Sequence, residues 1–175
     1  YLVAGYEGIT YAADHGCKII NCSWGGSFYS SLGQDVIDYA TINKDALVFA
    51  AAGNDGLLSD SYPAAYNYVI SVGSTTNNDV KSSFSNYGYT VDLCAPGSNI
   101  RSTYFNNTYS SLSGTSMASP TAAGAGAIVK SFYGNTYNAL QVGEKLRVTC
   151  DNIDALNSTM YRGLMGTGRV NLYHA

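Results

Sequence analysis

The stretch "SGTSMASPTAAGAGAIV", residues 113 to 129, places a serine at the entrance to a run of Ala, Gly and apolar side chains. Proline is tolerated in the first turn of a helix, so Pro120 predicts that Ser116 lies at or near a helix N-terminus. There the helix dipole favours developing negative charge, which suits a serine that attacks a carbonyl. The alternative is a serine that only caps the helix. Gly124 and Gly126 would each cost about 1 kcal/mol in a helix interior, so they predict a buried helix that neighbouring backbone approaches closely.

A second candidate for chemistry is Asn54, in the sequence "AGND" that follows an apolar run. The preceding glycine allows close approach, and the side-chain N–H groups of Asn54 can project beyond the strand. Asn54 is therefore a candidate oxyanion donor, and otherwise a side chain that caps its own loop. Sites in open parallel sheets form outside the carboxyl ends of the strands, and both "SWGG" (residues 23 to 26) and "AGND" follow predicted strands.

The elements that would position these residues are apolar runs that alternate with helix-like stretches. We expect helices at 2 to 14 and 31 to 44, and strands at 17 to 26, 46 to 54, 68 to 74 and 90 to 97. Continuous apolar strands joined by helices predict an α/β fold, a mostly parallel sheet with helices on both faces. The length of 175 residues fits one domain or part of one.

The composition argues against several classes of partner. A net charge of -3 with scattered Lys and Arg gives no electrostatic footprint for nucleic acid or an anionic membrane. No apolar stretch reaches the ~18 residues of a membrane span, and we identify no targeting segment. Charged residues are 12% of the chain against a typical ~25%, which suits a secreted protein. Among the four cysteines, Cys22 and Cys94 lie in apolar runs that favour buried free thiols over a disulfide.

These segments resemble the subtilisin-like serine proteases, the subtilase family. The run "GTSMASP" is highly specific to the nucleophile segment of that family, and "INCSWGG", "VFAAAGNDG" and "GTGRVNL" fall in the family's order. The resemblance covers nearly all of the chain. It implies a subtilisin-like fold and a serine endopeptidase, with Ser116 as the acylating nucleophile. It also implies that the Asn54 side chain and the Ser116 backbone N–H hold the oxyanion.

The resemblance further implies a peptide or protein substrate that pairs as an added strand with the segment after the first predicted strand. The residues assigned to substrate binding are Ser23, Trp24, Gly25, Gly26, Ala51, Ala52, Gly53 and Thr115. Because the substrate would pair through its main chain beside glycine, we expect cleavage of peptides with many different sequences. Whether Trp24 packs beside the specificity pocket or faces the core stays open.

In that family the acid and the base both precede the substrate strand, and neither motif occurs here. His15, in "DHG", is expected to be a surface residue at a helix end. Residues 1 to 175 therefore resemble the carboxyl-terminal part of a catalytic domain, with the amino-terminal part expected elsewhere. A truncated chain, one chain of a nicked enzyme and an incomplete gene product all stay open. Calcium is possible by family resemblance, but no ligands are identifiable, and no metal or other cofactor is assigned.

Two alternatives remain. An α/β-hydrolase-type esterase would use Ser116, then Asp151 or Asp154, then His174, in that chain order. That fold needs an apolar strand directly before the serine, whereas "STYFNNTYSSL" is polar and turn-rich. The other alternative is an inactive or peptide-binding module, because the chain lacks the family's acid and base.

Overall fold

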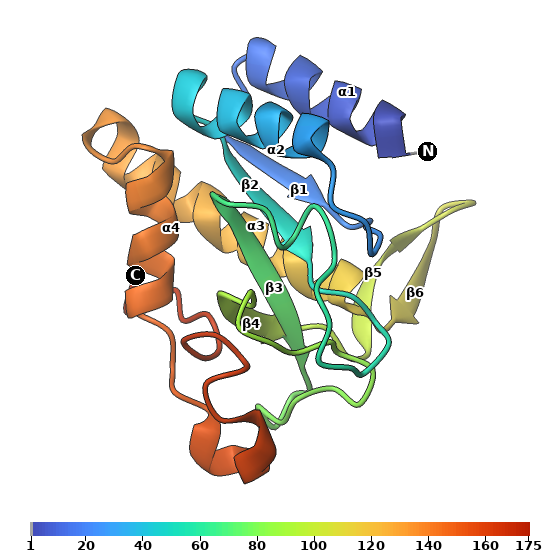
Figure 1. Ribbon diagram of the computed structural model, residues 1–175. Coiled ribbons are helices and arrows are strands. Elements are labelled where there is room, and N and C mark those ends of the chain that lie inside the picture. Colours follow the sequence, from blue (N-terminus) through green and yellow to red (C-terminus); the bar gives the residue numbers. More distant parts are fainter. Residues whose placement is uncertain (1) are drawn as a thin grey trace.

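The computed structural model describes residues 2 to 175 and contains a parallel sheet with strand order β1-β2-β3-β4 (Figure 1). The strands are β1 (Ile19–Cys22), β2 (Leu47–Ala51), β3 (Val69–Thr75) and β4 (Leu93–Pro96). One face carries α1 (Leu2–Asp14) and α2 (Ser31–Asp38), and the other carries α3 (Thr115–Tyr133) and α4 (Ala139–Val148).

The side chains of β2 explain why both faces are covered. Every residue of this strand is buried, and successive side chains point to opposite faces. Leu47 and Phe49 pack in the cluster that contains α3 and α4, while Val48 and Ala50 pack in the cluster that contains α1 and α2. The predicted fold, a parallel sheet with helices on both faces, is confirmed.

Several boundaries differ from the expected ones. The helix expected over 31 to 44 is α-helical only to Asp38 and continues as a π-helical turn, Tyr39–Asn43. The first strand is shorter than predicted, since it spans only Ile19–Cys22, and Gly26 pairs with Tyr62 rather than with β2. Helix α4, which the apolar pattern did not reveal, starts with a capping box between Asn138 and Gln141. The remaining helical elements are short 3₁₀ helices at Gly134–Thr136, Asp154–Leu156 and Thr159–Tyr161.

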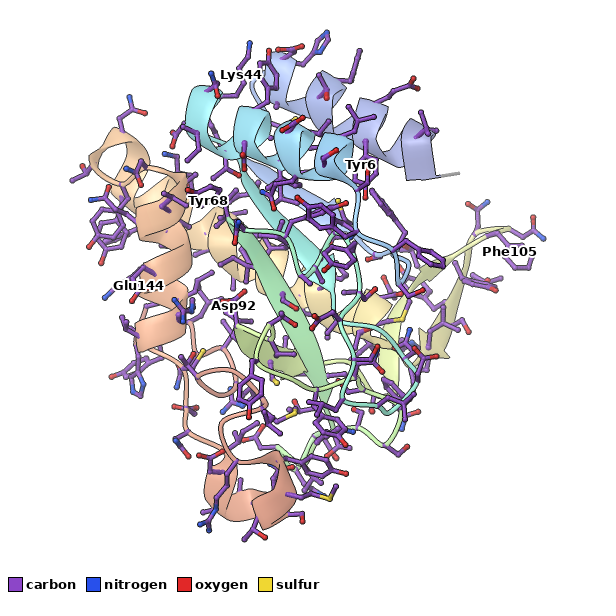
Figure 2. All side chains as sticks on the ribbon, viewed as in Figure 1. Tyr6, Lys44, Tyr68, Asp92, Phe105 and Glu144 are labelled. Atoms are coloured by element: carbon purple, nitrogen blue, oxygen red, sulfur yellow. The ribbon has the colours of Figure 1, made fainter. Side chains whose placement is uncertain are left out.

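The polar stretch before Ser116 forms an antiparallel hairpin, β5 (Ile100–Tyr104) and β6 (Thr108–Leu112). It projects from the body, with Phe105 at its tip (Figure 2). Asn106 and Asn107 close the turn in the left-handed region, each with φ of 56°. Because most hairpin side chains are exposed, no buried sheet strand leads directly into Ser116, as an α/β-hydrolase would require.

The two glycines of α3 have different surroundings. A Cβ on Gly126 would lie 2.7 Å from Cζ of Phe49, so this glycine lets the β2 ring pack directly on the helix. Gly124 is exposed and has nothing within 4 Å of its Cβ position. The prediction of close approach therefore applies to Gly126 alone, and its partner is a side chain rather than backbone. Two residues turn a helix by about 200°, so Gly124 faces away from the sheet.

Candidate active site

Ser116 is the second residue of α3, and Gly114 occupies the N-cap position. Ser116 is therefore near the helix N-terminus as predicted, but it is not the cap. The first N–H groups of a helix lack intrahelical acceptors. Within residues 2 to 175, the Ser116 N–H has no hydrogen-bond acceptor, so it remains available to a ligand at the positive end of the helix dipole.

Pro120 shapes the backbone around Ser116, although it sits in the second turn rather than the first. A proline has no N–H, so the carbonyl of Ser116 loses the helical partner four residues ahead. The Ser23 hydroxyl replaces that partner and donates to the Ser116 carbonyl at 2.8 Å. In return, the Ser116 hydroxyl donates to the Ser23 carbonyl at 3.2 Å. This pair of bonds ties the start of α3 to the segment that follows β1.

A second link holds the same two elements together. The Ser119 hydroxyl donates to Oδ1 of Asn21 at 2.7 Å, and Nδ2 of Asn21 donates to the Ser23 hydroxyl at 2.9 Å. The network therefore runs from α3 through the edge strand to Ser23. It fixes the position of the Ser116 backbone relative to the predicted substrate strand.

The side-chain amide of Asn54 is oriented by the same helix. Its Oδ1 accepts from the Thr115 backbone N–H at 2.8 Å and from the Thr115 hydroxyl at 2.9 Å. A backbone N–H requires an acceptor, so this contact fixes which end of the amide is oxygen. Nδ2 then points elsewhere and finds no acceptor within residues 2 to 175. Asn54 thus caps α3 with its oxygen, rather than its own loop as the sequence alternative expected, and leaves its nitrogen available as a donor.

The loop that carries Asn54 is braced by Asn86, a residue that sequence reasoning missed. Asn86 is buried, and its Oδ1 accepts from the N–H groups of Asp55 at 2.9 Å and Leu57 at 3.2 Å. The backbone N–H of Asn86 donates to the Gly53 carbonyl at 2.9 Å. Gly53 has φ of 108°, and a Cβ there would lie 2.3 Å from Nδ2 of Asn86. A side chain at position 53 would therefore displace Asn86.

We expect Asn86→Ala to lower kcat of the full-length protein about tenfold, because two N–H groups lose their acceptor and the Asn54 loop loosens. Steady-state kinetics with matched thermal melts separate positioning from stability. A variant that melts earlier but keeps the parent kcat below its melting range would contradict the positioning role.

A cavity of about 360 Å³ opens beside Ser116. All the predicted catalytic and substrate-binding residues except Ala52 line it. Ala52, the first residue after β2, is instead buried with Val91 and Cys94. Gly25 has no room for a side chain, since a Cβ would lie 2.6 Å from the Ser61 hydroxyl oxygen.

Trp24 both lines the cavity and packs inward, so the two alternatives that the sequence left open apply together. One part of it lines the cavity. Its ring also packs edge-on against the Tyr6 ring at 5.5 Å between centroids and covers Gly5 of α1. The tryptophan is therefore at once a wall of the cavity and an anchor for α1.

Neither histidine reaches the serine. His15 is exposed just after α1, where its Nδ1 lies 2.7 Å from the Tyr11 carbonyl oxygen. His174 lines a different cavity with Ile128, and the helical rise puts Ile128 about 18 Å along α3 from Ser116. His174 Nδ1 lies 3.6 Å from Asp151 Oδ1, so these two alternative triad residues meet each other but not Ser116.

Other reactive groups are not arranged for chemistry. Burial raises the pKa of the Cys22 thiol to about 12, which keeps this neighbour of Ser23 protonated. All four cysteines are free thiols. Across residues 2 to 175, no three His, Cys, Asp or Glu side chains gather as metal ligands. No helix in the same range has the length and hydropathy to cross a bilayer.

Comparison with known proteins finds similarity to one family of proteases. A family model described as the subtilase family matches residues 4–168. Thermitase from Thermoactinomyces vulgaris is 54% identical over 98 residues, which cover 56% of this chain and 35% of thermitase. The cell wall-associated protease of Bacillus subtilis (strain 168) is 46% identical over 95 residues, covering 54% of this chain and 10% of that protein. The match spans about a third or less of these relatives' length.

Solved structures agree along nearly the whole chain. A cold adapted subtilisin-like serine proteinase matches with a TM-score of 0.82 and 32% identity, over 94% of this chain and 59% of that one. The prenylagaramide maturation protease PagA matches in fold, with a TM-score of 0.91 at 24% identity, over 99% of this chain and 66% of that one. Because the family model covers most of the sequence and the fold agrees with subtilisin-like structures, this chain belongs to the subtilase family.

Proposed function

We propose that the full-length protein containing this chain is a serine endopeptidase that cleaves peptide bonds through an acyl-enzyme at Ser116. One observation carries the proposal. Ser116 lines a cavity near a helix N-terminus, with its own N–H and the Asn54 side chain nearby. This is the arrangement that acyl transfer requires, a nucleophile next to donors for the developing oxyanion.

The proposed reaction begins when a histidine from outside this chain removes the Ser116 hydroxyl proton. The oxygen, now free of its bond to the Ser23 carbonyl, attacks the scissile carbonyl carbon. The Ser116 N–H and Nδ2 of Asn54 donate to the oxyanion. The histidine then gives its proton to the leaving amine, and water hydrolyses the ester by the same steps.

The substrate is proposed to bind as an extended strand along Ser23, Trp24 and Gly25. Main-chain hydrogen bonds supply the pairing, and glycine lets another backbone approach. Gly26 pairs with Tyr62 through two bonds, Gly26 N to Tyr62 O at 2.9 Å and Tyr62 N to Gly26 O at 2.7 Å. This pairing holds the strand extended beyond the end of β1.

The acid and base are proposed to come from an amino-terminal part of the same catalytic domain. Within residues 2 to 175, β1 pairs only with β2, so its other edge can accept further parallel strands. Asn21 and Ser119 link that edge to α3, so an added segment would lie close to Ser116. The proposed location is outside the cell, supported by the low content of charged residues and by the similarity to a cell wall-associated protease.

We expect the 175-residue chain alone to hydrolyse no peptide at an enzymatic rate, because a serine hydroxyl without an adjacent base is a weak nucleophile. Adding a separately made amino-terminal part should restore turnover. The assay uses a chromogenic peptide with a Ser116→Ala control. Robust turnover by the chain alone that the control abolishes would place a base within the chain.

A peptide-binding role without catalysis is the second candidate, favoured by the distance of both histidines from Ser116. It predicts that the full-length protein binds peptides at the cavity and leaves them intact. Mass spectrometry of the peptide after incubation separates the two candidates.

A further inference from the structure

We propose that the cavity beside Ser116 selects peptides with lysine or arginine at the residue whose carbonyl is attacked, the P1 residue. This inference rests on the proposed endopeptidase function. It adds a preference at one position to the broad cleavage expected from main-chain pairing. The observation behind it is the lining of the cavity, which includes two acidic residues, Asp55 and Asp60, and no Lys, Arg or His.

The two carboxylates are not neutralised by the protein. Every ion pair within residues 2 to 175 involves other acidic groups, so Asp55 and Asp60 have no cationic partner there. Both residues are exposed to solvent. The cavity thus presents a negative field beside the serine, and a cationic side chain is the complementary ligand.

Local hydrogen bonds hold both residues in place. The Asp55 N–H is bound to Oδ1 of Asn86 at 2.9 Å, and its carboxylate lies 3.5 Å from Nδ2 of the same residue. The Asp60 carboxylate accepts from the Thr90 hydroxyl at 2.9 Å. Because Asp55 follows the oxyanion candidate Asn54 directly, its charge is tied to the site rather than to a distant surface loop.

The walls of the cavity suit the stem of a long basic side chain. Trp24 and Ala51 offer apolar surface, and Gly25 and Gly53 line the cavity beside them without side chains of their own. Lysine and arginine bury their methylene stems against such surface while the charged head reaches water or a carboxylate. An acidic P1 side chain would place like charges together, whereas an uncharged one would gain only the apolar contact.

The test uses the full-length protein and fluorogenic peptides that differ only at P1, with Lys, Arg, Gln, Met or Glu. Glutamine lacks the charge of lysine but keeps a long polar side chain, so the Lys-to-Gln ratio of kcat/KM isolates the electrostatic contribution. We expect a ratio of about tenfold, the size that two exposed ion pairs provide. The ratio should decline as salt is added, because exposed charges are screened.

Charge-removing variants supply the matched comparison. Asp55→Asn combined with Asp60→Asn should bring the Lys-to-Gln ratio close to one. Asp35→Asn, an exposed residue of α2 that does not line the cavity, should leave the ratio unchanged.

Equal kcat/KM for Lys and Gln peptides, or a preference that persists in the double variant, would overturn the P1 preference. The proposed endopeptidase function would still stand. Failure to hydrolyse any of the peptides would instead overturn the proposed function and the preference with it. A Lys and Arg preference that the double variant loses supports both.

Discussion

Ser116→Ala in the full-length protein is expected to lower kcat by about 10⁶ and to leave KM nearly unchanged. The size of this loss is the one known for the nucleophile of subtilisin, a member of the same family. The physical reason is that alanine removes the attacking oxygen but keeps the cavity and both oxyanion donors, so the substrate still binds. Steady-state kinetics with a chromogenic peptide measure both constants.

Ser131→Ala is the matched control for this variant. Ser131 is an exposed serine of the same helix, so its loss changes the helix surface without touching the cavity. We expect parent kinetics from the control. Turnover in Ser116→Ala within tenfold of the parent would contradict the assignment of the nucleophile.

Asn54→Ala is expected to reduce kcat by about 10² to 10³ with little change in KM, the range known for the oxyanion donor of subtilisin itself. Nδ2 contributes most once the substrate oxygen carries charge, so its loss affects the transition state more than substrate binding. A variant that changed only KM would rule out the oxyanion role.

Because the Asn54 oxygen also caps α3 through Thr115, the alanine variant removes two functions at once. Asn54→Asp separates them, since aspartate keeps the accepting oxygen but has no N–H donor. We expect Asn54→Asp to lose at least as much kcat as Asn54→Ala. Recovery of kcat in Asn54→Asp would mean that helix capping, not the oxyanion contact, accounts for the effect.

The sheet was predictable from sequence because β2 is buried on both faces and therefore reads as an unbroken apolar run. The start of α3 was close to its predicted place because Pro120 limits where that helix can begin. Asn54 was proposed as a site residue because it lies three residues after the end of β2, and sites of parallel sheets form at such strand ends.

Other features left no comparable signal. The hairpin of β5 and β6 is exposed on both faces, so its side chains do not alternate between apolar and polar. Asn86 acts through tertiary contacts to a loop about 30 residues earlier, and such contacts leave no local pattern. For α4, the capping pair Asn138 and Gln141 was the available signal.

The most direct test of the central claim, that Ser116 is the nucleophile, is labelling of the full-length protein with a fluorophosphonate probe followed by peptide mapping. An activated serine reacts with such a probe, whereas ordinary surface serines do not. We predict a single labelled residue, Ser116, and no label in Ser116→Ala. A labelled protein whose modified residue is any other would contradict the account.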